Sequence, residues 1–465
     1  MVETPATDPS MPSAEALPAS LDAPADERLA CVIREVAAAT PDRPAIVAEA
    51  GSDARRTISY GELAQAIAGL EDQLNAAQPR GVIARVRRPE ALVAVAAACG
   101  RQGTPVAFLA DDSRDLLGEL HDWVTVDDSL TLPPVAAAAR GPIGMEAAVP
   151  HVTVATSGTA GPPKLVRHSW ESVLASARLA AQWHDLAWLL VYDATRWAGI
   201  QVWAQAILTG GRLVVPASRD PDVVSKAIVD EAVAILPATP TLLRRLLTSA
   251  DPAVLTGNKL SRITLGGEAA DADLLTRAHE AFPKAGITQV YATTELGEVF
   301  RVADGQPGFP AKWLGKPLIG GVTLNVRRDG ELLVRASRDA AEVGTGDLVE
   351  LQGDRYVFAG RRTDAIIVGG AKVFPKRVEE VLREVSGVAE ARVYGVPSSL
   401  TGELVAAEIT LTPEAAAAAA GDGADLKAAA LAHCRGVLEP HSVPRVLEIV
   451  TRIATTAAGK TPRRG

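Results

Sequence analysis

The stretch "AVAILPATPTLLRRLLTSA" at residues 232–250 decides the fold class. An apolar run at 232–238 is followed directly by a segment whose leucines recur at helical spacing. The next apolar run, "RITLGG" at 262–267, is again followed by a helical segment, at 271–282. Strands that alternate with helices in this way predict an α/β architecture with a largely parallel sheet.

The same alternation extends toward the N-terminus. Apolar runs that read as strands alternate with helical patterns at 43–50, 60–74, 80–86, 89–100 and 211–216. We therefore expect one large domain of mixed, largely parallel sheets.

The pattern changes after about residue 310. Asp329-Gly330 and Gly353-Asp354 separate alternating runs and indicate two β-hairpins. From residue 360 onward a hairpin, a helix and two strands indicate a small α+β unit, interrupted by a low-complexity alanine-rich insert at 413–427. We expect a disordered tail at 1–26, an N-terminal domain at 27–359 and a mobile C-terminal domain at 360–465.

Composition narrows the class of protein. A chain of 465 residues is too long for one core, and its net charge of −9 argues against nucleic acid or an anionic membrane as partner. Three scattered cysteines form neither a metal motif nor a disulfide framework. No basic residue precedes Arg28, and no apolar run reaches membrane-spanning length. These features predict a soluble cytoplasmic protein.

Five short motifs carry the chemistry, and each is weak alone. In chain order they are "TSGTAGPPK" (156–164), "YATTE" (291–295), "GTGD" (344–347), "GRRTD" (360–364) and "AAGK" (457–460). The first, rich in glycine and hydroxyls with one lysine, indicates a phosphate-binding loop, although its spacing is not that of the P-loop.

In this order the motifs resemble those of the adenylate-forming superfamily, which includes acyl- and aryl-CoA synthetases, peptide-synthetase adenylation domains and firefly luciferase. The resemblance covers nearly the whole chain after about residue 28. The chain departs from the family pattern at Ala160, Pro162, Ala292 and Thr363. Of these, Thr363 occupies the usual hinge position, next to Arg362.

The resemblance implies two half-reactions. A carboxylate attacks the α-phosphate of ATP to give an acyl adenylate and pyrophosphate, and a thiol then takes the acyl group. Catalysis of the first step should consist of positioning and charge neutralisation. The resemblance further implies that the enzyme uses ATP and Mg²⁺, and that the acyl acceptor is coenzyme A or a separate phosphopantetheinyl carrier protein.

The resemblance also assigns the nucleotide site. Glycines, hydroxyls and Lys164 of the first motif would hold the phosphates, although a lone loop lysine is often merely solvated. Thr294 would contact the α-phosphate and Glu295 would hold Mg²⁺. The remaining ATP-binding positions are Thr156, Ser157, Gly158, Thr159, Gly266, Gly267, Glu268, Tyr291, Asp347 and Arg361.

Among these, Tyr291 would stack on adenine or pack in the core, and Asp347 would accept the ribose hydroxyls. Lys460 is the expected catalytic lysine, which contacts both the attacking carboxylate and the nucleotide. A hinge at Arg362–Thr363 would remove it for the second step.

Residues 192–211 resemble the substrate-binding segment of peptide-synthetase adenylation domains, with matches at Asp193, Ala194 and Trp197. Asp193 would pair with a substrate ammonium, or it would cap the helix that follows, and the sequence leaves both open. The other implied pocket positions are Ile263, Leu265, Val290, Glu298 and Val299. Glu298 would favour a second amine or hydroxyl, or face solvent.

These expectations describe an AMP-forming acid–thiol ligase for a small aryl or amino-substituted acid. The alternatives are an amino-acid adenylating enzyme with an amine or other unusual acceptor, and a catalytically silent nucleotide-binding homologue.

Overall fold

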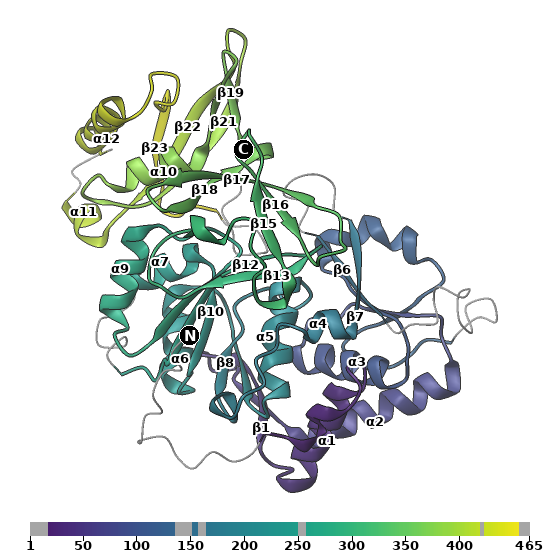
Figure 1. The fold of residues 1–465 in the computed structure, drawn as a ribbon. Coiled ribbons are helices and arrows are strands. Elements are labelled where there is room, and N and C mark those ends of the chain that lie inside the picture. Colours follow the sequence, from purple (N-terminus) through teal and green to yellow (C-terminus); the bar gives the residue numbers. More distant parts are fainter. Residues whose placement is uncertain (1–16, 135–150, 157–163, 250–256, 419–422, 455–465) are drawn as a thin grey trace.

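The computed structural model describes residues 17–134, 151–156, 164–249, 257–418 and 423–454. Two sheets with helices between and outside them form the larger part of the molecule, and a smaller part lies against it, beyond a third, antiparallel sheet (Figure 1). The α/β prediction with a small α+β C-terminal unit is confirmed.

The largest sheet has eight strands in the order β13-β12-β11-β10-β8-β9-β1-β2. Its six central strands run parallel, whereas the edge strands β2 and β13 are antiparallel to their neighbours. The strands are β1 (Pro44–Ala50), β2 (Arg56–Ser59), β8 (Ala187–Leu189), β9 (Arg212–Pro216), β10 (Ile235–Ala238), β11 (Arg262–Gly266), β12 (Gly286–Thr293) and β13 (Gly297–Val302). The parallel sheet predicted from residues 232–282 therefore includes β10, β11 and the helices after them.

A second sheet, in the order β5-β3-β4-β6-β7, is parallel except for the edge strand β7. Its strands are β3 (Val82–Ala84), β4 (Val106–Phe108), β5 (Val124–Val126), β6 (His151–Ala155) and β7 (Leu165–Ser169). Strands β6 and β7 form the hairpin that carries the first motif.

Helices cover both faces of the eight-stranded sheet, which fits the largely apolar sequences of its strands β8 and β10. Helices α1 (Arg28–Ala39), α2 (Tyr60–Ala77), α3 (Pro89–Arg101) and α5 (Trp197–Leu208) share one core with both sheets. Helices α6 (Pro221–Asp230), α7 (Pro240–Ser249) and α9 (Ala272–Ala281) cover the opposite face. The short helix α4 (Trp170–Leu174) follows β7.

The apolar segment at 91–100 lies within α3, where every residue from Ala91 to Gly100 is buried. A helix that is apolar on all sides belongs in the core of a large domain. Among the described residues, no helix is long and apolar enough to span a membrane.

The third sheet is antiparallel, in the order β14-β18-β17-β16-β15. Its strands are β14 (Phe309–Pro310), β15 (Thr323–Val326), β16 (Glu331–Arg335), β17 (Val343–Gln352) and β18 (Arg355–Arg361). Both predicted hairpins are confirmed, and their glycines, Gly330 and Gly353, have the positive φ angles (87° and 61°) that these turns require. Strand β18 continues past the predicted boundary at 360 to Arg361.

The smaller part contains a sheet in the order β20-β19-β22-β21, with β23 paired to β22. Its strands are β19 (Ile366–Val368), β20 (Ala371–Val373), β21 (Val388–Ser398), β22 (Gly402–Leu411) and β23 (Val446–Ile449). Its helices are α10 (Pro375–Arg383), α11 (Pro413–Ala418) and α12 (Ala424–Val437). The alanine-rich insert thus contributes α11 and the start of α12.

Candidate functional site

A cavity of about 260 Å³ lies where the eight-stranded sheet, the antiparallel sheet and the C-terminal part meet. Five of the predicted ATP-binding residues line it: Gly267, Glu268, Tyr291, Asp347 and Arg361. They come from four separate segments of the sequence, on or directly after strands β11, β12, β17 and β18. Because the parallel strands β10, β11 and β12 all end at this edge, the residues that follow them converge here, as in other α/β sheets.

The Asp347 carboxylate is held from two sides. The Tyr291 hydroxyl donates to its Oδ2 at 2.6 Å, and Nε of Arg361 donates to its Oδ1 at 2.9 Å. Burial opposes the charge on the guanidinium, but the neighbouring carboxylate overcomes this effect, so the pKa of Arg361 is raised. Burial, and then Asp347, raise the pKa of Tyr291 as well, which keeps its hydroxyl protonated as a donor.

The ring of Tyr291 stacks on two protein rings. Its centroid lies 5.1 Å from that of Phe300 and 5.0 Å from that of Phe358, with interplanar angles of 23° and 26°. The ring is partly buried and packs against the aromatic core next to it. Tyr291 also lines the cavity, so its stacking on adenine stays a prediction.

The turn after β11 brings backbone and a carboxylate to the cavity. Gly267 adopts a φ of 82°, which glycine tolerates better than other residues. An oxygen of Glu268, Oε2, accepts from the backbone N–H and the hydroxyl of Thr241, at 3.2 and 2.6 Å. These bonds tie the turn after β11 to the start of α7.

The base of the first motif is closed by two hydrogen bonds. The Thr156 N–H donates to the Lys164 carbonyl at 2.9 Å, and the Lys164 N–H donates to the Thr156 hydroxyl at 3.0 Å. The Lys164 side chain is exposed, and the next residue begins strand β7 rather than a helix. Ser157, Gly158 and Thr159 lie outside the described residues, as does Lys460.

Arg196 supports the same loop, and sequence reasoning missed it. Its Nη1 donates to the carbonyls of Ala155 and Thr156, at 2.9 and 2.7 Å. Arg196 directly precedes α5. It is 41 and 40 positions away in sequence from Ala155 and Thr156, whose carbonyls it binds. Only its position beside the Asp193–Trp197 match could have drawn attention to it.

Thr294 and Glu295 form the turn between β12 and β13. The Thr294 carbonyl accepts from Nε2 of His168, a buried residue of β7, at 2.7 Å. The Glu295 side chain is exposed, and no described residue forms an ion pair with it. An open carboxylate fits Mg²⁺, which keeps several waters and is held by one or two carboxylates together with phosphates.

His168 is a second residue that sequence reasoning missed. Its ring lies 4.4 Å from that of Trp197, and burial lowers its pKa against the smaller opposing effects of the Thr294 carbonyl and Glu295. His168 therefore connects the phosphate-loop hairpin, the substrate segment and the Thr294–Glu295 turn.

Asp193 does not cap helix α5, so that interpretation is wrong. The N-cap residue is Arg196, and no side chain caps the helix. Instead, Oδ1 of Asp193 accepts from the backbone N–H and the hydroxyl of Thr195, at 2.9 and 2.7 Å. Its charge also acts on the guanidinium of Arg219, whose pKa is lowered by burial and partly restored by Asp193.

Glu298 has protein partners too. Its two carboxylate oxygens accept from Arg301 at 2.5 Å each, and Arg178 lies 3.9 Å away. The side chain is only 18% exposed, so it neither faces solvent nor presents a free charge.

The other predicted pocket positions separate into two groups. Leu265 and Val290 line the cavity. Ile263 and Val299 pack in apolar cores, and Trp197 is buried beside His168 with Ala194 half-buried near it. Ile263 and Leu265 share one face of β11, but Leu265 lies nearer the end of the strand, where the cavity is, and Ile263 is buried deeper in the core.

Arg362 is anchored to the antiparallel sheet. Its Nη2 donates to Asp329 at 2.6 Å and to Glu331 at 2.9 Å. The Thr363 hydroxyl donates to Asp364. Within the described residues, no hydrogen bond joins the Thr363 side chain to the antiparallel sheet. Of the two predicted hinge residues, Arg362 thus belongs structurally with the larger part.

Two family models match this chain. The model described as AMP-binding enzyme matches residues 68–337, and the model described as AMP-binding enzyme C-terminal domain matches residues 377–460. The chain belongs to the AMP-binding enzyme family, and with it to the adenylate-forming superfamily.

Curated relatives agree. The chain is 27% identical to 2-succinylbenzoate–CoA ligase of Bacillus licheniformis over 66% of its length and 68% of the relative's. It is 26% identical to the medium/long-chain-fatty-acid–[acyl-carrier-protein] ligase FadD10 of Mycobacterium tuberculosis, over 68% of this chain and 65% of that protein. The matches thus span about two thirds of each relative.

Solved structures share the fold. The anthranilate CoA ligase AuaEII in complex with anthranoyl-AMP has a TM-score of 0.70 at 21% identity, over 95% of this chain and 97% of that one. The o-succinylbenzoate coenzyme A synthetase of Bacillus subtilis, in complex with ATP and magnesium, has a TM-score of 0.64 at 24% identity, over 93% and 98%.

The family defines the class of enzyme. The chain is an AMP-forming ligase, which uses ATP to adenylate a carboxylic acid and then transfers the acyl group to an acceptor thiol.

Proposed function

We propose that this enzyme activates a small aryl carboxylic acid and transfers the aroyl group to coenzyme A or to a separate carrier protein. The observation that supports the nucleotide half of this proposal is the cavity in which Tyr291, Asp347 and Arg361 form one hydrogen-bonded unit. We place the domain boundary within residues 363–365, between the anchored Arg362 and strand β19.

In the first half-reaction a carboxylate oxygen of the acid attacks the α-phosphorus of ATP. The bond to the bridging oxygen breaks, and pyrophosphate leaves with the electron pair. Both reactants are anions, so the protein must hold them in line and neutralise charge. Lys164 and Lys460 supply positive charge, and the loop of Thr156, Ser157, Gly158 and Thr159 supplies donors to the leaving phosphates.

Around these reactants, Glu295 would hold Mg²⁺, which would neutralise phosphate charge, and Thr294 would donate to the α-phosphate. The Asp347 carboxylate accepts hydrogen bonds from the ribose hydroxyls, and Arg361 keeps this carboxylate oriented. The backbone of Gly266, Gly267 and Glu268 lies against the bound nucleoside.

In the second half-reaction the thiolate of the acceptor attacks the carbonyl carbon of the adenylate. The bond to the phosphate oxygen breaks, and AMP leaves. Lys460 serves only the first step, so we propose that rotation about Thr363 withdraws it before the second.

The substrate proposal rests on the two acidic residues that the sequence indicated as candidates for binding an amine of the substrate. Asp193 accepts hydrogen bonds from Thr195 and interacts electrostatically with Arg219. Glu298 forms ion pairs with Arg301 and Arg178. Neither carboxylate needs a bound ammonium to balance its charge. An aryl acid therefore fits better than an α-amino acid, in keeping with the 2-succinylbenzoate and anthranilate that relatives and neighbours are named for.

Carboxylate-dependent ATP–pyrophosphate exchange tests this proposal. The panel contains benzoate, 2-aminobenzoate, 4-hydroxybenzoate, octanoate, alanine and phenylalanine. We expect exchange with one or more aryl acids and none with the two amino acids, and we expect Asp193→Asn to keep this order of preference. Exchange restricted to amino acids and lost in Asp193→Asn would overturn the substrate proposal.

The acceptor and the lysine are tested separately. With the active acid, thioester formation is measured with free coenzyme A. We expect Lys460→Ala to lose exchange while it still forms thioester from a supplied acyl adenylate. Normal exchange in this variant would contradict the role of Lys460.

A further inference from the structure

Arg245 on helix α7 bridges the two parts of the molecule. Its Nε and Nη2 donate to the two carboxylate oxygens of Glu390, at 2.7 and 3.2 Å. The same Nη2 also donates to the backbone carbonyl of Ile453, at 2.8 Å. One guanidinium thus binds strand β21 and the segment after β23, which are far apart in the sequence of the C-terminal part.

The bridge is shielded from water. The side chains of Arg245 and Glu390 are 13% and 14% exposed. A bidentate arginine–carboxylate pair has a fixed geometry, and removing one partner leaves the other charge in a poorly solvated place. The bridge is therefore suited to defining one arrangement of the two parts.

Ile453 connects this bridge to the chemistry. It is 2% exposed and lines the nucleotide cavity together with Glu390. Lys460 follows seven positions later in the sequence. At about 3.3–3.6 Å per residue, this length of chain keeps the lysine within roughly 25 Å of the Ile453 carbonyl that Arg245 holds.

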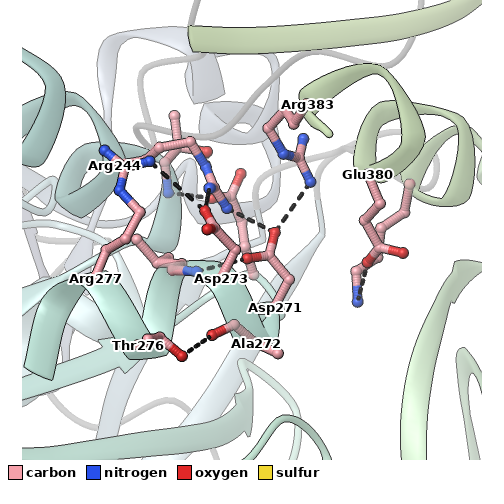
Figure 2. Close-up of polar contacts among 12 residues, drawn as sticks. Arg244, Asp271, Ala272, Asp273, Thr276, Arg277, Glu380 and Arg383 are labelled. Carbon is pink, nitrogen blue, oxygen red and sulfur yellow. Dashed lines mark hydrogen bonds and ion pairs between the residues drawn. The ribbon is translucent and has the colours of Figure 1, made fainter. Parts of the chain in front are cut away.

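Other contacts favour the same arrangement. Asp271, the N-cap of α9, binds Arg244 of α7 at 2.7 Å and Arg383 of α10 at 3.1 Å (Figure 2). Burial disfavours its charge, yet the two arginines lower the pKa of Asp271, so it is ionised in this setting. Nζ of Lys376 donates to the Phe358 carbonyl at 2.7 Å.

Arg245 contacts the chain that leads to Lys460 through a shielded bond, whereas the neighbouring ion pair between Arg452 and Asp220 is exposed on both sides, at 64% and 53%. We propose that Arg245 is a positioning residue for adenylation, which acts by holding Ile453 and Glu390 at the nucleotide cavity. This inference rests on the proposed role of Lys460.

The inference predicts unequal effects on the two half-reactions. A contact made in only one arrangement of the two parts shifts the equilibrium toward that arrangement by the free energy of the contact. It therefore favours only the half-reaction that takes place in that arrangement. Loss of the bridge should thus slow adenylation, which needs Lys460. It should leave thiol transfer unaffected or faster, because that step does not need the lysine.

The test uses the full chain and three variants, Arg245→Gln, Glu390→Gln and the charge exchange Arg245→Glu with Glu390→Arg. Arg277→Gln is the matched control, because Arg277 forms an exposed ion pair with Asp273 within α9 and has no ion pair with any described residue of the C-terminal part. Adenylation is measured by ATP–pyrophosphate exchange with benzoate, or with the acid that gave exchange in the panel. Thiol transfer is measured from the corresponding supplied adenylate and coenzyme A.

We expect Arg245→Gln and Glu390→Gln to reduce exchange at least tenfold and to keep thioester formation within twofold of the wild type. The charge exchange restores the ion pair with position 390 but leaves the Ile453 carbonyl without its donor, so it should recover only the part of the rate that depends on Glu390. Equal losses in both half-reactions, or no loss of exchange, would overturn the inference. If Lys460→Ala retains exchange, the proposed function is at fault instead, whatever the Arg245 variants do.

Discussion

The Tyr291 hydroxyl and the Asp347 carboxylate form a hydrogen bond of 2.6 Å across 56 positions of sequence. This bond joins the "YATTE" motif to the "GTGD" motif. Arg361 of the "GRRTD" motif binds the other oxygen of the same carboxylate. Three motifs that are weak in isolation are therefore parts of one hydrogen-bonded unit that lines the cavity.

Tyr291→Phe tests this unit. It removes one donor to a charged acceptor, a loss of about 1.5–3 kcal/mol, while the ring keeps its packing. If Asp347 binds the ribose, we expect KM for ATP to rise about tenfold or more, as measured in the exchange assay. Tyr356→Phe, in the same aromatic cluster on Phe309, is the control and should leave KM unchanged. Equal KM values in both variants would exclude a role for the hydroxyl in nucleotide binding.

Glu295→Gln tests the proposed metal ligand. Replacing a carboxylate by an amide weakens a hard oxygen ligand. We expect the Mg²⁺ concentration for half-maximal exchange to rise at least tenfold. Glu350→Gln, at an exposed glutamate of β17, is the control. An unchanged Mg²⁺ requirement would remove Glu295 from the site.

His168 should make stability depend on pH. Burial lowers its folded pKa below the ordinary value of 6.5. Between the two pKa values the unfolded chain binds a proton that folded His168 does not, so stability falls as the pH drops from above 6.5 toward the folded pKa.

Thermal unfolding between pH 7.5 and 5.5 measures this effect. We expect the wild-type Tm to fall more steeply than that of His168→Gln, which keeps a donor for the Thr294 carbonyl but does not titrate. The exposed His433→Gln should behave like the wild type. Identical slopes for the wild type and His168→Gln would show that His168 does not titrate across the folding transition.

Local pattern predicted most of the architecture. Strand–helix alternation, the two hairpin turns and the α+β end of the chain all depend on neighbours in sequence, and all are confirmed. The order of the motifs identified the family, because shared chemistry preserves that order along the chain.

Side-chain partners could not be predicted in this way. His168 meets Thr294 across 126 positions, and Arg245 meets Glu390 across 145. No periodicity records such pairs, because they depend on which segments the sheets bring together. The helix-cap interpretation of Asp193 failed for a local reason, since Thr195 satisfies the carboxylate before the helix begins.

The anchoring of Arg362 to Asp329 and Glu331 has a kinetic consequence. Only residues 363–365 separate it from strand β19, a tether of about 10 Å. Whichever interdomain contacts break, the C-terminal part stays at a high effective concentration beside the cavity. The proposed rotation between the half-reactions would then be a first-order event within one molecule, and dilution of the enzyme would leave the ratio of the two rates unchanged.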